Sequence, residues 1–115
     1  MASQLEKALL YPVEGLLKSL PQKPHILYIN AVDEGHMTHP VFSKGDLDVV
    51  QWHITASQAY KNHAQNLFSG FEKIKGIYDL ILLRATKQKI ETRGLLAHAA
   101  LLLDPNGILV CAGLN

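Results

Sequence analysis

Tyr78-Asp79-Leu80-Ile81-Leu82-Leu83-Arg84 is the stretch of sequence that decides the fold. This short, continuous apolar run is typical of a β-strand that is buried on both faces of a parallel sheet. Residues 87–103 follow it with apolar side chains at helical spacing, and an Asp104-Pro105-Asn106-Gly107 turn precedes a second predicted buried strand at residues 108–112. A strand, a helix and a further strand in this order predict a right-handed βαβ unit.

The region upstream repeats this alternation. Residues 25–30 and 47–52 are short apolar or β-rich runs and are predicted strands. Residues 31–44 between them have no period and are predicted to form a long connection with one helical turn. The apolar positions of residues 54–71 fit a helical period throughout, but residues 67–71 equally fit a short extended piece after a helix that ends near His63, and we favour this second interpretation. The chain is therefore predicted to be an α/β, Rossmann-like domain with a mostly parallel sheet and flanking helices.

An amphipathic helix is predicted ahead of the first strand. Ser3 and Glu6 have the spacing of a capping box, and the apolar positions that follow recur with helical period as far as Leu20. Pro12 removes a backbone donor from the middle of this segment, which predicts either a kink or two short helices.

Length and composition restrict the class of protein. A chain of 115 residues with 48% hydrophobic and 18% charged residues supports one globular domain, 1–115, and excludes a disordered protein. No apolar run approaches the roughly 20 residues of a membrane helix, and no signal peptide or disulfide pattern is evident, so a cytoplasmic protein is predicted. The sequence stops just after a predicted buried strand that would need covering on both faces, which predicts a piece of a longer protein.

The loop after the first predicted strand is where doubly wound enzymes bind their cofactor, through several glycines. Here residues 30–36 contain one glycine, Gly35, and two acids, Asp33 and Glu34, which would repel a phosphate. S-adenosylmethionine has no phosphate, but the missing glycines count against its binding as well. We therefore predict no cofactor-binding residues in this chain and interpret Asp33 and Glu34 as exposed loop residues.

Histidine and cysteine give no pattern that predicts a metal or catalytic site. His36 and His39 are three residues apart without a nearby cysteine, which favours surface histidines over metal ligands. His98 is predicted to be a half-buried packing residue of the last helix. Cys111 is predicted to be a small buried residue of the last strand.

The basic residues are concentrated in one part of the chain, because residues 61–93 carry seven Lys or Arg against three acids. Four of these cations lie at the carboxyl end of the predicted strand 78–84 and in the start of the following helix, the edge where ligands approach open α/β sheets. Cations at a helix N-terminus oppose the helix dipole, which favours a phosphate-binding role, while a solvated surface is the alternative interpretation. The four candidate RNA contacts are Arg84, Lys87, Lys89 and Arg93.

A specific set of residues in the last third of the chain points to a family. They are the run from Tyr78 to Lys89, Glu91, Leu95, Leu96, Leu101 to Leu103, Gly107, Val110 and the final Gly113-Leu114-Asn115. This pattern resembles the N-terminal domain of the ribosomal RNA guanine-N2 methyltransferases of the "methyltransferase small" type. The chain departs from the family pattern at Thr86, where the family usually has proline, and at Leu114, where it often has an acid.

This resemblance implies a duplicated methyltransferase fold whose N-terminal copy has lost its cofactor site. The chain would then be non-catalytic, with its own C-terminal catalytic domain and ribosomal RNA as partners and with S-adenosylmethionine bound by the C-terminal copy. The catalytic Asn-Pro-Pro-aromatic motif of that copy is missing from this sequence. The alternatives are a free-standing enzyme that binds S-adenosylmethionine or a nucleotide through an atypical loop, and an interaction module or homodimer that pairs through its exposed last strand.

Overall fold

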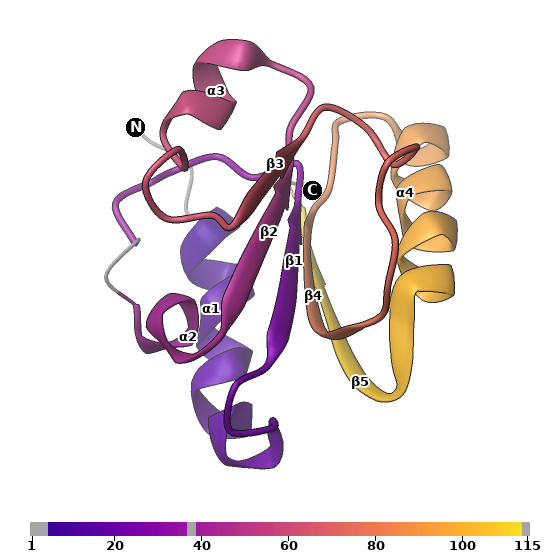
Figure 1. Cartoon of the computed structure of the whole chain (residues 1–115). Helices are drawn as coiled ribbons and strands as arrows, with labels where there is room; N and C mark the ends of the chain where they lie inside the picture. Colours follow the sequence, from indigo (N-terminus) through magenta and orange to yellow (C-terminus); the bar gives the residue numbers. More distant parts are fainter. Residues whose placement is uncertain (1–4, 37–38, 114–115) are drawn as a thin grey trace.

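The computed structural model describes residues 5–36 and 39–113 and contains one five-stranded sheet with helices on both faces (Figure 1). The strand order is β3-β2-β1-β4-β5, and every neighbouring pair is parallel. This architecture confirms the predicted α/β, Rossmann-like class. The strands are β1 (His25–Ile29), β2 (Asp46–Val50), β3 (Asn66–Phe68), β4 (Tyr78–Arg84) and β5 (Leu103–Ala112).

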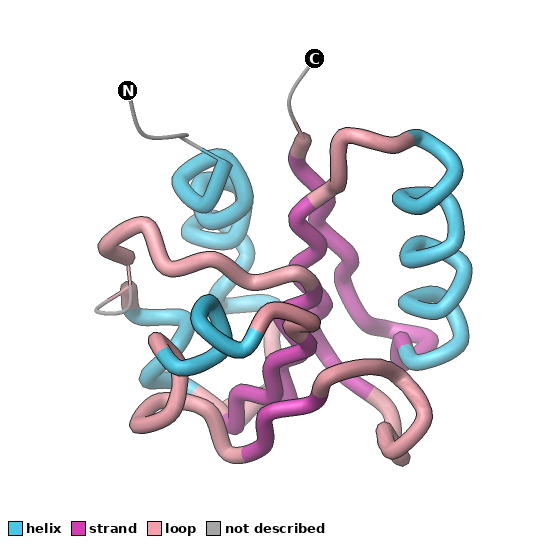
Figure 2. The backbone as a smooth tube through the Cα atoms, turned by 90° about the horizontal axis from the view of Figure 1, so that it is seen from above, coloured by secondary structure: helices cyan, strands magenta, loops and turns pink. Residues whose placement is uncertain are grey.

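The central strands β1 and β4 are buried on both faces, as their continuous apolar runs predict. Their side chains alternate between two apolar layers. Tyr28 and Leu82 belong to the layer beneath the helix α1 (Leu5–Leu16), and Leu27 and Ile81 to the layer beneath α4 (Lys89–Leu102). Figure 2, viewed from above, shows the strands between these two helices.

The first helix is continuous from Leu5 to Leu16 and carries Pro12 within it, so the predicted alternative of two short α-helices is wrong. A short 3-10 turn, η1 (Leu17–Ser19), extends it toward the first strand. Ser3, the other half of the predicted capping box, lies outside the described residues.

The connection between β1 and β2 contains the predicted single helical turn, α2 (Pro40–Lys44). Gly45 follows it, and a side chain there would place its Cβ only 1.9 Å from the Pro24 carbonyl oxygen. The Asp46 amide donates to that same oxygen at 2.9 Å, which starts β2 beside β1. Glycine at position 45 is thus required by the close approach of two backbone segments.

The divided prediction for residues 54–71 is confirmed in its order. The helix α3 (Ile54–Gln58) comes first and the extended strand β3 second, although the helix ends well before His63. The residues between them form turns.

The Asp104 to Gly107 turn lies inside the strand β5, where it forms an irregularity. Tyr78 pairs with Leu103 and Leu80 pairs with Ile108, so the four residues between these pairs bulge out of the ladder. The Asp104 side chain accepts a hydrogen bond from the Asn106 amide at 2.8 Å, as expected of an Asx turn.

The last helix and strand are less buried than their sequences predict. In α4 only Leu95 and Ala99 are buried, while Ile90 and Leu101 are more than 80% exposed. β5 is the edge of the sheet and is only half-buried, because β4 lies on one side of it and no described strand on the other. The prediction of a fully buried last strand is therefore wrong.

Candidate functional site

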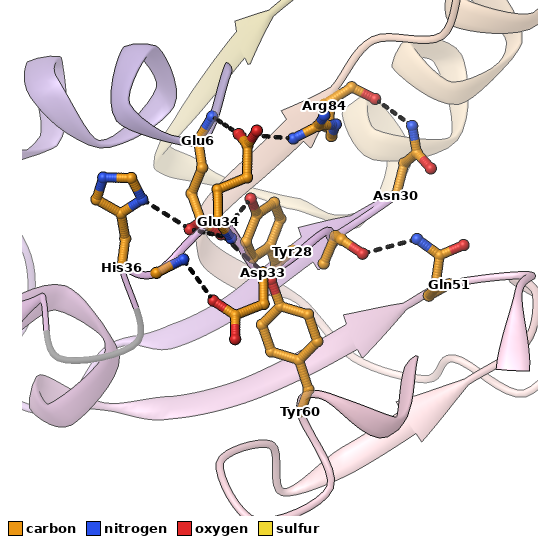
Figure 3. A network of polar contacts seen from close by, with 11 residues as sticks. Glu6, Tyr28, Asn30, Asp33, Glu34, His36, Gln51, Tyr60 and Arg84 are labelled. Carbon is orange, nitrogen blue, oxygen red and sulfur yellow. Dashed lines mark hydrogen bonds and ion pairs between the residues drawn. The ribbon is translucent and has the colours of Figure 1, made fainter. Parts of the chain in front are cut away.

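The carboxyl ends of β1 and β4 define the switch point of the sheet, because the chain leaves β1 toward β2 and β3 and then returns to β4 on the other side of β1. Open α/β sheets bind ligands at this position. The residues around it form the polar network drawn in Figure 3.

Asn30 begins the loop after β1 in the left-handed region, with a φ of 59°. This conformation is uncommon outside glycine, but asparagine tolerates it. The Asn30 backbone amide donates to the Val50 carbonyl at 2.8 Å, and its side-chain amide donates to the Arg84 carbonyl at 2.9 Å. The loop is thereby fixed to the ends of both β2 and β4 at its first residue.

Glu34 is largely buried, since its side chain is 9% exposed, and this contradicts the prediction of an exposed loop residue. Its Oε1 accepts hydrogen bonds from the Glu6 backbone amide at 2.8 Å and from Arg84 Nη1 at 3.0 Å. A carboxylate that accepts from a backbone amide at the amino end of a helix is stabilised by the helix dipole, which accounts for the inward position of the Glu34 side chain. Asp33 is exposed, as predicted, and accepts from the Gly35 amide at 2.8 Å.

Glu6 is fully buried and is the centre of the network. Its Oε2 accepts hydrogen bonds from the hydroxyls of Tyr28 at 3.0 Å and Tyr60 at 3.2 Å. Its Oε1 accepts from the Glu34 backbone amide at 3.0 Å and lies 2.9 Å from His36 Nδ1. A buried carboxylate is stable only when its oxygens are satisfied in this way.

Sequence reasoning interpreted Glu6 only as a capping residue and missed this role. A signal was available, because Glu6 is four and seven residues before Leu10 and Val13, both of which are buried on the core face of α1. A charged residue at helical spacing with buried positions predicts an inward carboxylate.

The two tyrosines of the network are held in their neutral form. Burial raises the pKa of both Tyr28 and Tyr60 far above the ordinary value, and the negative charge of Glu6 raises both further. At neutral pH these hydroxyls therefore act as donors to the carboxylate.

S-adenosylmethionine is the cofactor that the resemblance to methyltransferases implies, and the residues at the switch point do not fit it. Asn30 and Glu34 both bridge to Arg84 across the carboxyl ends of β1 and β4, where such a cofactor would approach the sheet. At the end of β2, Gln51 is buried and its side-chain amide donates to the Ala31 carbonyl at 2.7 Å. These side chains would have to leave their partners before a ligand could contact the strand ends.

A second buried carboxylate, Asp48, lies nearer the amino end of the sheet and on the α4 face. Its Oδ2 accepts from the Tyr78 hydroxyl at 2.8 Å and lies 3.0 Å from His25 Nε2, and its Oδ1 accepts from the Asn66 side chain at 2.9 Å. Burial raises the pKa of Tyr78 well above the ordinary value, with a further contribution from Asp48.

The four candidate RNA contacts fall into two groups. The Arg84 side chain is 13% exposed and its guanidinium pairs with Glu34. Lys87, Lys89 and Arg93 are exposed at the amino end of α4, and the last two are four residues apart, on one side of the helix. The connection between β4 and α4 is fixed to the helix, because the Thr86 backbone amide donates to the Thr92 hydroxyl at 3.0 Å.

His36 and His39 do not converge on one site. His36 faces Glu6, whereas His39 lies 3.3 Å from Glu14 and accepts from the Val41 amide, so the two histidines contact different acids. Within residues 5–36 and 39–113, no group of three or more His, Cys, Asp or Glu side chains is arranged to hold a metal ion.

The predictions for His98 and Cys111 are both wrong on burial. Each is exposed, because α4 buries only two of its residues and β5 is the sheet edge. His98 packs nonetheless, with its ring stacked on Phe71 at a centroid distance of 4.5 Å.

The sequence matches no model of a known protein family and no curated protein. Solved structures are similar to it. A candidate methyltransferase from Pseudomonas syringae matches with a TM-score of 0.63 and 18% identity, over 87% of this chain and 71% of that protein. The mycolic acid cyclopropane synthase CmaA1, solved with SAH and CTAB, matches with a TM-score of 0.60 and 14% identity, over 92% of this chain and 42% of the synthase.

The chain therefore has the fold of methyltransferases, which confirms that part of the resemblance. Its assignment to the ribosomal RNA type, its place as an N-terminal copy and its cytoplasmic location stay predictions. None of the helices in the part of the chain that the structure describes has the length and apolar character of a bilayer-spanning helix.

Proposed function

We propose that this chain is the non-catalytic, methyltransferase-like N-terminal domain of an S-adenosylmethionine-dependent ribosomal RNA guanine-N2 methyltransferase. Its role is to support a C-terminal catalytic domain and to help hold RNA. The observation that carries the proposal is the bridging of the switch point: Asn30 and Glu34 both bond to Arg84 where a methyltransferase sheet would receive its cofactor. The fold is retained and its ligand edge is used for internal contacts.

The RNA contacts proposed are the cations next to that edge. Lys87, Lys89 and Arg93 are exposed and have no ion pair within residues 5–36 and 39–113, so they are the best placed of the four candidates to meet phosphates. Arg84 is expected to contribute less to RNA binding, because its guanidinium already pairs with the Glu34 carboxylate. Phosphate contacts of this kind give affinity that depends on salt and little on sequence.

The test is a double charge reversal, Lys87→Glu with Lys89→Glu, measured by RNA binding over a range of salt concentrations. Losing two phosphate contacts should weaken binding and reduce the slope of log affinity against log salt by about 1.4, at about 0.7 per contact on single strands. The matched control reverses Lys7 and Lys18, which are exposed on or beside α1 on the other face of the sheet. Equal affinity and slope for the test variant and the unaltered protein would overturn the RNA role.

Calorimetry with S-adenosylmethionine separates this proposal from a cofactor-binding enzyme. No saturable heat is expected for the unaltered protein, because the contacts at Asn30, Glu34 and Gln51 would first have to break. Saturable binding at micromolar levels would contradict the non-catalytic assignment.

A second role, pairing through the β5 edge, is favoured by the exposure of that side of the molecule. β5 hydrogen-bonds to β4 alone among the described strands, and Cys111 on β5 and Leu101 on the neighbouring α4 are both exposed. Uncovered strand edges recruit further strands. A homodimer formed in this way would give a sedimentation coefficient that rises with protein concentration, whereas a constant monomer value would exclude it.

A further inference from the structure

Three aromatic rings form a ladder on the α4 side of the molecule, away from the Glu6 network. Trp52 follows the end of β2, Phe71 lies in the loop after β3, and His98 lies on α4. Phe71 and His98 are stacked at 4.5 Å with their planes 2° apart, and Trp52 meets Phe71 edge-on, with centroids 6.1 Å apart and planes at 65°.

This ladder lines a hollow of about 330 Å³ together with Gly70 and Glu72. Trp52 is 43% exposed and His98 is also exposed, whereas Phe71 is half-buried against the core and holds the two outer rings in place. A large exposed indole beside a hollow of this size is a platform for another flat ring.

The surroundings of the hollow indicate which flat ring it takes. The loop that carries Phe71 continues into the exposed cations Lys73 and Lys75. A smaller hollow, lined in part by Lys73, shares Gly70 and Glu72 with the first and extends it along the loop. Aromatic platforms flanked by cations are how proteins hold single-stranded nucleic acid.

We propose that the Trp52, Phe71 and His98 ladder is a stacking site for an unpaired nucleobase of RNA. The base lies on the exposed face of Trp52, and the neighbouring phosphates contact Lys73 and Lys75 of the loop. The Glu72 carboxylate at the hollow can accept a hydrogen bond from the amino group of cytosine or adenine. This inference rests on the proposed function for its partner, but it uses residues separate from Lys87 and the switch point.

Trp52 is the only tryptophan of the chain, so it reports directly on stacking. We expect an RNA strand of about ten nucleotides, a length that fits known single-strand site sizes, to quench the fluorescence of Trp52. A strand of the same length without bases should leave the fluorescence unchanged, because phosphates alone do not stack.

Variants give the second arm, with affinity measured by anisotropy of labelled RNA. Trp52→Ala should weaken binding by about 5- to 100-fold, the range expected for one lost stacked base. Its salt slope should not change, because no phosphate contact is lost. Trp52→Tyr retains a ring and should retain most of the affinity, which also guards against loss of folding. The matched control is Tyr11→Ala, which removes a ring that is 75% exposed on α1, in the opposite layer.

The outcomes separate the two proposals. If RNA binds with a salt slope that depends on Lys87 and Lys89, but Trp52 is not quenched and Trp52→Ala binds as tightly as the unaltered protein, the stacking site is overturned and the RNA role stands. If RNA does not bind at all, both are overturned. Quenching by the RNA together with weakened binding of Trp52→Ala, but not of Tyr11→Ala, supports the stacking site.

Discussion

Two buried carboxylates, Glu6 and Asp48, lie near opposite ends and on opposite faces of the sheet, and each is bound by tyrosine hydroxyls. Their partners differ in kind. The side chains around Asp48, on β2, come from β1, β3 and β4, so this acid joins strands of one sheet to one another. The partners of Glu6 come from a strand, from the loop after it and from the turns after α3.

The two networks stabilise different kinds of structure in this methyltransferase fold. Near the amino end of the sheet, the hydrogen-bonded Asp48 carboxylate links side chains of the strands. At the carboxyl end, the Glu6 carboxylate fixes the loop after β1 against α1, at the edge where open α/β sheets bind their ligands. The Glu6 network is therefore the part of the molecule on which the non-catalytic interpretation depends.

The largest effect is expected from Glu6→Ala. The substitution leaves the hydroxyls of Tyr28 and Tyr60 and the Glu34 amide buried without an acceptor, which should lower the free energy of unfolding by about 3 to 5 kcal/mol. Urea unfolding measures this. Glu14→Ala is the matched control on the same helix, because that side chain is 61% exposed, and it should change stability by no more than about 0.5 kcal/mol. A similar result for both variants would contradict the central role of Glu6.

Asp48→Ala should have the next largest effect, about 2 to 4 kcal/mol of unfolding free energy. It leaves Tyr78 and Asn66 without their acceptor, but His25, at 34% side-chain exposure, can turn to water. The same urea titration measures it, and a loss greater than that of Glu6→Ala would reverse the order of the two networks.

Alkaline pH tests the tyrosines of both networks. Burial raises the pKa of Tyr28, Tyr60 and Tyr78 in the folded state above their unfolded value of about 10. The unfolded chain then loses protons that the folded chain retains, so stability is complete below pH 10 and falls as pH rises above it. Each tyrosine should contribute a loss of about 1.4 kcal/mol per pH unit.

Tyr60→Phe should reduce the dependence of unfolding free energy on pH by the contribution of one tyrosine. Tyr11→Phe should leave that dependence unchanged, because Tyr11 is exposed. Unfolding free energies at several pH values between 9 and 12, bracketing the tyrosine pKa of about 10, provide the measurement. A slope that is the same for Tyr60→Phe and the unaltered protein would show that this hydroxyl titrates normally.

The smallest loss of stability is expected from Arg84→Ala, about 1.5 to 3 kcal/mol, because Glu34 loses its charged partner but keeps its bond to the Glu6 amide. The change should be local. Hydrogen exchange should accelerate at residues 31–36 and stay unchanged in β1 and β2. Faster exchange throughout the sheet would mean that Arg84 supports the whole fold and not the loop alone.

The sequence predicted the elements well where burial is dictated by the pattern. The runs at 25–30 and 78–84 became the central strands, since continuous apolar residues can be buried on both faces only inside a sheet. The same reasoning overestimated the burial of α4 and β5, because the pattern of a strand does not reveal whether a neighbour exists on each side. Position in the sheet, and not composition, decides the exposure of Cys111.

The candidate site was predictable only in its outline. The glycine-poor loop and the cations at the strand end are visible in the sequence, but the pairing of Glu34 with Arg84 joins residues 50 positions apart. Contacts between distant polar side chains depend on tertiary geometry that local propensity does not encode. Glu6 was the exception, since its helical spacing from Leu10 and Val13 marks it as inward-facing.

The partners of the Glu6 carboxylate lie 22, 28, 30 and 54 residues further along the chain. A ribosome that has just synthesised α1 has therefore made none of them, and a helix of 12 residues is marginal in water by itself. The carboxylate can gain its full set of hydrogen bonds only after Tyr60 has been translated, so the contacts that fix α1 to the sheet are all non-local.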